Sequence, residues 1–185
     1  MSLPTPKRRQ HIHTRQIQCQ GFKREDGLWD IEARLLDTKT YDFANYARGG
    51  FIPAGDAIHD MTLRVSVDLQ FVIHEIDVVS EETPFPICKA APAGMKKLVG
   101  LRMESGWMRE VKSRVGGTAG CTHLIEMLGH IATTAFQTIH DTLESKAASQ
   151  PNRGEPLVLD TCMALARNSE VVKIQWPEFY KGKES

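Results

Sequence analysis

The chain has 185 residues, of which 41% are apolar and 25% are charged, so it can bury a core. Its 23 Lys and Arg residues balance 23 Asp and Glu residues, which gives a formal net charge of zero. This balance argues against non-specific attraction to nucleic acid or to an anionic membrane surface. No segment has the length of an apolar membrane span, and the N-terminus lacks the apolar core of a signal peptide. We expect a cytoplasmic protein with no nucleic-acid or membrane partner.

The order of patterns along the chain predicts one α+β domain over residues 11–180. Residues 1–10 are polar and contain two prolines, so we expect a disordered tail there. The alternation from His11 to Arg15 indicates the start of a first edge strand. The tail should therefore end where the sheet begins.

Residues 28–79 are predicted to form a three-stranded antiparallel meander. Asp26-Gly27 is a turn signal, and Trp29, Ile31, Ala33 and Leu35 then alternate with charged residues. The same period of two occurs over residues 61–67 and 73–79. This period indicates strands with one buried and one solvated face. Residues 37–56, between the first two strands, are rich in aromatic residues and glycines, which indicates an ordered loop across the sheet.

The second half of the chain is predicted to be mostly helical. Short helices are expected from Pro92 toward Gly100 and over residues 105–115. The longest helix is expected over about residues 122–143, because its apolar residues recur with a helical period. The members of this stripe are Leu124, Leu128, Ile131, Ala135 and Ile139. The predicted fold is an antiparallel sheet packed against two or three helices.

The C-terminal part is predicted to add two further strands. Residues 145–155 are small and polar and indicate a linker. The apolar runs at 157–166 and 171–174 flank Arg167-Asn168-Ser169, which predicts a terminal hairpin. This hairpin would complete the sheet.

The four cysteines are far apart and include no CxxC pair, so free thiols are expected rather than a disulfide framework. Cys19 lies among polar residues and looks incidental, whereas Cys162 lies in an apolar run and suggests a core residue. Cys88 follows a proline-rich turn after a strand, where it is either a buried thiol or a ligand. Cys88 and Cys121 are therefore the two thiols that we consider as candidate site residues.

Cys121 and His123 form the sharpest candidate pair. Three glycines at 116, 117 and 120 precede the thiol, and they allow a tight turn and a close approach of the backbone to a ligand. Two residues apart on a helix, the side chains point about 200° apart, so they converge only if Cys121 precedes the helix as a cap. The alternative is a small buried thiol beside a histidine at the polar edge of the helix.

His59-Asp60 opens a strand after a glycine-containing loop. A carboxylate next to a histidine can orient it as a metal ligand or as a base. The alternative, a surface pair without chemistry, is equally compatible with the sequence.

The chain resembles a bacterial family known only as a domain of unknown function. The resemblance rests on Gly21-Phe22-Lys23-Arg24-Glu25-Asp26-Gly27-Leu28-Trp29-Asp30-Ile31-Glu32, on His59-Asp60-Met61 and on Gly120-Cys121-Thr122-His123-Leu124. It covers about residues 13–177 and implies no activity.

A weaker similarity in element order is to iron–sulfur cluster scaffold proteins of the IscU/NifU type. This similarity implies a ligand set in which His59-Asp60 replaces a cysteine motif, and Cys88 and Cys121 match the second and third cysteines. Gly120 stands where the scaffold has a histidine, and His123 would substitute two positions later.

The leading hypothesis is a metal site, for zinc or iron, formed by His59, Cys88 and Cys121 with Asp60 or His123 completing the shell. Nitrogen, sulfur and oxygen donors of this kind suit a tetrahedral ion. The first rival is a thiol enzyme or small-molecule-binding domain with Cys121 as nucleophile, His123 or His59 as base, and the loop at 41–51 as a lid. The second rival is a structural module that binds a protein partner, in which Cys88, Cys121 and Cys162 would all be buried in apolar packing with no pocket joining them.

Overall fold

The computed structural model describes residues 3–149 and 154–182. Contacts divide the chain into two compact units, Met1–Ile139 and His140–Ser185, where the sequence predicts one domain. The first unit holds the sheet and most of the helices, which confirms the predicted α+β class. Residues 3–10 of the predicted tail form neither helix nor strand. None of the described helices is long and apolar enough to cross a bilayer.

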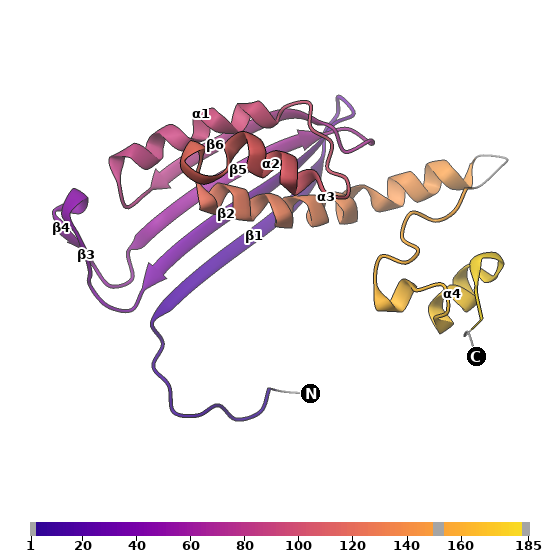
Figure 1. The fold of residues 1–185 in the computed structure, drawn as a ribbon, viewed down its shortest axis with the longest axis horizontal. Coiled ribbons are helices and arrows are strands. Elements are labelled where there is room, and N and C mark those ends of the chain that lie inside the picture. Colours follow the sequence, from indigo (N-terminus) through magenta and orange to yellow (C-terminus); the bar gives the residue numbers. More distant parts are fainter. Residues whose placement is uncertain (1–2, 150–153, 183–185) are drawn as a thin grey trace. The chain divides into compact units, whose positions relative to one another are not determined.

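A four-stranded antiparallel sheet forms the framework of the first unit (Figure 1). Its strands are, in spatial order, β1 (His13–Lys23), β2 (Trp29–Lys39), β5 (Ala57–Val67) and β6 (Ile73–Glu82). The predicted meander corresponds to β2, β5 and β6, and the predicted edge strand is the beginning of β1. The sequence therefore predicts both the strands and their antiparallel order.

The aromatic loop between β2 and β5 contains a small separate hairpin. It consists of β3 (Phe43–Asn45), the 3-10 turn η1 (Tyr46–Arg48) and β4 (Gly50–Ile52). The Asn45 amide donates a hydrogen bond to the Pro84 carbonyl, and the ring of Tyr46 lies 5.8 Å from that of Phe85. The hairpin is thus fixed against the segment that follows β6.

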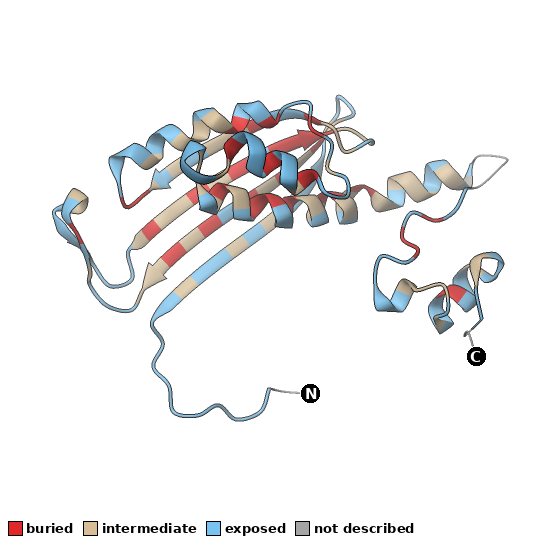
Figure 2. Cartoon of the chain, in the orientation of Figure 1, coloured by how far each residue is buried: buried red, intermediate tan, exposed pale blue. Residues whose placement is uncertain are grey.

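Helices and 3-10 turns cover one face of the sheet (Figure 2). They are η2 (Pro86–Ala90), α1 (Ala91–Met95), η3 (Lys96–Leu98), α2 (Trp107–Val115), η4 (Gly117–Ala119) and α3 (Thr122–Ala148). The predicted stripe of α3 is completely buried. It meets the alternate apolar residues of β2 and β5, such as Ile31, Leu35, Leu63 and Val65, which are also buried. Apolar faces with periods of 3.6 and 2 thus form one core.

The predicted C-terminal hairpin is wrong. Residues of this segment form η5 (Met163–Leu165), α4 (Glu170–Gln175) and η6 (Pro177–Phe179) instead of strands. The Ser169 hydroxyl caps α4 by accepting a hydrogen bond from the Val172 amide. A serine cap followed by an acidic first turn stabilises a helix, and this signal outweighs the short apolar run. The predicted linker at 145–155 overlaps the end of α3, and its residues 150–153 lie outside the described residues.

The close approach of α3 to β1 depends on Gly21. A Cβ atom there would lie 1.9 Å from the Thr138 hydroxyl oxygen and 2.7 Å from the Thr138 Cβ. We expect Gly21→Ala to lower the free energy of unfolding by about 1–3 kcal/mol through overpacking. Gly129→Ala is the matched control, because this helical position is exposed and an added Cβ atom would meet no atom within 4 Å outside the backbone of its own helix. The control should raise the free energy of unfolding by up to about 1 kcal/mol, because alanine has a higher helix propensity than glycine. Urea denaturation of both variants tests this, and equal effects would contradict the assigned helix–sheet contact.

Candidate functional site

Three neighbouring strands place three polar side chains in one row at the same end of the sheet. Arg15 on β1 is paired with Asp37 on β2, and Asp37 is paired with His59 on β5. Asp37 continues the alternation of Trp29 to Leu35, so its side chain faces the helices and is only 2% exposed. A carboxylate in such a place requires charged or hydrogen-bonding partners.

Asp37 has those partners. The Arg15 guanidinium donates to both carboxylate oxygens, at 2.8 and 2.7 Å, in a side-on pair. His13 Nε2 lies 3.2 Å from Oδ1, and His59 Nδ1 lies 3.0 Å from Oδ2. Burial acts to raise the pKa of Asp37, but the hydrogen bond and charge of Arg15 outweigh it, and the pKa is lowered. Asp37 is therefore an ionised carboxylate near neutral pH.

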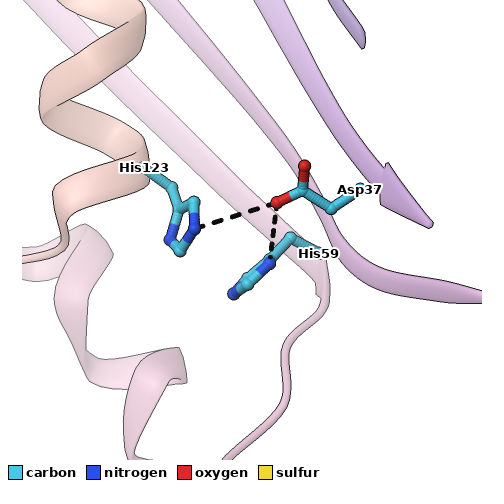
Figure 3. A group of neighbouring side chains, drawn as sticks. All are labelled: Asp37, His59 and His123. Carbon is cyan, nitrogen blue, oxygen red and sulfur yellow. Dashed lines mark hydrogen bonds and ion pairs between the residues drawn. The ribbon is translucent and has the colours of Figure 1, made fainter. Parts of the chain in front are cut away.

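His123, in the first turn of α3, completes a group with Asp37 and His59 (Figure 3). Its Nε2 lies 3.8 Å from Asp37 Oδ2, and its ring centroid is 3.8 Å from that of His59. One ligand atom from each residue lies within 4.8 Å of the others. Burial and the neighbouring His123 lower the pKa of His59, although Asp37 acts to raise it, and this favours the neutral imidazole, the form that binds metals. We refer to Asp37, His59 and His123 as the Asp–His–His group.

Cys121 immediately precedes α3, which is the position that its convergence with His123 requires. Its Sγ lies 3.7 Å from His123 Nδ1. Burial acts to raise the pKa of Cys121, but hydrogen bonds from the His123 side chain and from the backbone amides of Leu124 and His123 lower it overall. At Gly120, a Cβ atom would lie 2.0 Å from the Val115 carbonyl oxygen. Glycine thus allows the chain to pass the end of α2 and present the thiol.

A pocket of about 620 Å³ opens beside the Asp–His–His group. His59, Cys88, Cys121 and His123 all contribute to its lining, so the structure brings four of the five predicted ligands to one cavity. We call this cavity the Cys121 pocket. No residue of the predicted lid at 41–51 lines it, although Tyr46 contacts the wall residue Phe85.

Asp60, the fifth predicted ligand, lies elsewhere. It follows His59 directly in a strand, and successive strand side chains point to opposite faces. Its carboxylate pairs with Arg34 at 2.8 and 2.6 Å. Asp37 takes the place in the group that the sequence gives to Asp60.

One cysteine, Cys162, differs from its predicted environment. Cys162 is exposed, not in the core, because it precedes a 3-10 turn and lies in no strand. Cys19, Cys88 and Cys121 are all half-buried. The structural rival requires buried cysteines with no shared pocket, which these positions do not provide.

Two residues of the site escape sequence reasoning. The sequence predicts Asp37 as the first residue of a loop, although β2 continues to Lys39, and it predicts Arg15 as a polar residue of an edge strand. The sequence does contain one signal for Asp37. Counted in steps of two from Trp29, Asp37 falls on the apolar face of the strand. A charged residue in an apolar row indicates a buried pair.

The chain belongs to the family described as "Protein of unknown function (DUF2889)", whose profile matches residues 13–137. The match ends two residues before the boundary of the first unit, so the family corresponds to the sheet and the helices that cover it. No curated protein and no solved structure matches the chain. The similarity to iron–sulfur scaffold proteins stays a prediction.

The Arg15–Asp37 pair should stabilise the first unit. Asp37→Asn removes the buried charge that Arg15 pairs with and leaves the guanidinium only its contact with Glu126, so it is expected to cost about 3 kcal/mol of unfolding free energy at pH 7. Asp60→Asn is the matched control, because Asp60 pairs with Arg34 in the same geometry but the Arg34 side chain is 57% exposed, and solvent-exposed ion pairs contribute less.

The same pair predicts a pH dependence. The pKa of Asp37 is lower in the folded protein than in the unfolded chain, where it is about 3.9. Ionised Asp37 therefore stabilises the fold above that pH, and this contribution is lost as the pH falls through the folded pKa. The difference between wild type and Asp37→Asn should therefore shrink in acid. Chemical denaturation between neutral and acid pH measures it. Equal losses for the Asp37 and Asp60 variants would contradict the assigned role of Asp37.

Proposed function

We propose that the protein binds a divalent transition-metal ion, zinc or iron, through Asp37, His59 and His123. The observation that supports this most directly is the convergence of one carboxylate oxygen and two imidazole nitrogens within 4.8 Å. Bonds of about 2.0–2.2 Å place the ligands of one ion roughly 3–3.5 Å apart. Asp37 Oδ2 is already 3.0 Å from His59 Nδ1 and 3.8 Å from His123 Nε2. Binding therefore requires an inward movement of His123 and a transfer of the His59 proton from Nδ1, which now faces Asp37, to Nε2.

The residues around the group suit a metal site of the open kind. Metal-binding histidines are usually held by a hydrogen bond at the other ring nitrogen. Cys121 serves this purpose for His123, since a proton on Nδ1 donated to the sulfur leaves Nε2 free for the ion. His59 and His123 also line the Cys121 pocket. Three protein ligands beside a pocket leave coordination positions for water or substrate, as in catalytic sites.

Arg15 sets a limit on the affinity. Its guanidinium already neutralises Asp37, so a divalent ion gains less attraction than it would at an unpaired carboxylate. The two predicted cysteine ligands, Cys88 and Cys121, are not part of the Asp–His–His group. Cys121 contacts the group only through His123. We therefore expect weaker binding than in structural zinc sites with cysteine ligands.

Zinc titration of chelator-treated protein tests the proposal. We expect one equivalent to bind in calorimetry, and the absorption of a cobalt derivative to show nitrogen and oxygen ligands. His123→Gln and Asp37→Asn should each lower the affinity at least about tenfold. Asp60→Asn is the control and should bind like wild type, because its carboxylate is paired on the other face. Substoichiometric binding, or equal losses in Asp60→Asn, would overturn the proposal.

Thiol chemistry at Cys121 is the second candidate, favoured by the 3.7 Å contact between Sγ and His123 Nδ1. Here Cys121 is the nucleophile, His123 takes its proton, and the Asp37 carboxylate, 3.8 Å from His123 Nε2, stabilises the imidazolium that forms. Cys121 lines a pocket and starts a helix, two conditions that favour a reactive thiolate.

Alkylation of metal-free protein by iodoacetamide tests this candidate. Only the thiolate reacts, so the alkylation rate of Cys121 should rise with pH through a midpoint below that of a free cysteine, about 8.5. His123→Gln should move the midpoint upward, because it removes a hydrogen bond and a charge that favour the thiolate. Peptide mass spectrometry separates Cys121 from the exposed Cys162, which serves as an internal reference. A midpoint at or above the free value would exclude this role.

A further inference from the structure

The walls of the Cys121 pocket are mainly apolar. Their side chains include Met61, Pro84, Phe85, Ile87, Ala91 and Ala119. Among the described residues that line the pocket there is no Lys, Arg, Asp or Glu. A phosphorylated or multiply charged ligand would therefore find no counter-charge along these walls.

The polar end of the pocket is formed by two imidazoles. His59 and His123 line the cavity, while Asp37 stands behind them and does not. An ion held by the Asp–His–His group would thus meet the occupant through its open coordination positions. The charges there are the carboxylates of Asp37 and Glu126, the Arg15 guanidinium and the divalent ion, so the end carries one positive charge overall. A single negative charge on an oxygen donor fits it best.

We propose that the Cys121 pocket binds a small monocarboxylate with an apolar aryl or branched alkyl body. The carboxylate binds the metal ion, and the body lies against the apolar walls. This inference rests on the proposed metal site. It adds the class of ligand that the metal-bearing pocket accepts.

The probes are phenylacetate, acetate and 2-phenylethanol, titrated into the cobalt-loaded full chain. Phenylacetate should change the visible absorption of cobalt and bind at least about tenfold more tightly than acetate, because its ring buries apolar area. It should also bind more tightly than 2-phenylethanol, which lacks the charged donor. Equal affinities for phenylacetate and acetate would overturn the inference.

Ile87→Glu tests where the probe binds. Ile87 is 80% exposed, so the variant should fold, and its carboxylate would face an anionic ligand across the pocket. Its phenylacetate affinity should fall at least about fivefold, with zinc affinity unchanged. Ile174→Glu is the matched control, since Ile174 is 71% exposed and lines no part of this pocket. Equal phenylacetate affinity in both variants would overturn the inference.

Two further outcomes separate this inference from the metal site itself. If zinc binds stoichiometrically but phenylacetate leaves the cobalt spectrum unchanged, the ligand class is wrong and the metal site stands. If phenylacetate binds metal-free and metal-loaded protein equally well, the metal does not hold the carboxylate, which also overturns the inference. If zinc does not bind, both proposals fail.

Discussion

The site depends on one buried carboxylate. Asp37 occupies a position in β2 where the four preceding residues of the same face are apolar, and a lone charge there would be costly. Arg15 offsets that cost, and a second contact at 2.6 Å, from Arg15 to Glu126 of α3, ties the guanidinium to the helix as well. The ion pair thus joins two strands to the first turns of α3, which is where His123 is placed.

The core and the site lie on the same faces of β2 and α3, with the site at one end of each face. The row of β2 side chains is apolar from Trp29 to Leu35 and becomes polar at Asp37. Helix α3 changes in the same direction, from a completely buried apolar stripe to His123 and Cys121 at its start. Because the sheet and the helix pack along their whole apolar lengths, the polar ends must meet. The core therefore determines the position of the site.

Sequence patterns predict the elements well where one period dominates. The alternation in β2 and β5 and the stripe of α3 are strong because each covers many residues with one buried face. The C-terminal hairpin fails because its apolar runs are short and a serine cap competes with them. The site is harder still. His59 and Asp60 are neighbours in sequence but face opposite sides, whereas Asp37 reaches His59 only through a strand register that includes a bulge at Asp37/Thr38. Register depends on tertiary pairing, which a single sequence does not contain.

The two candidate chemistries make opposite demands on one imidazole. A metal ion at Nε2 of His123 requires the proton on Nδ1, directed at Cys121. Thiol catalysis requires Nδ1 to accept the thiol proton while Nε2–H faces Asp37. Both arrangements use the same atoms, at 3.7 and 3.8 Å, so the tautomer of His123 decides between them. His59 supports the metal proposal over the thiol proposal. A neutral second imidazole 3.0 Å from the same carboxylate oxygen would be a ligand in the first arrangement, whereas in the second it only donates a hydrogen bond to Asp37.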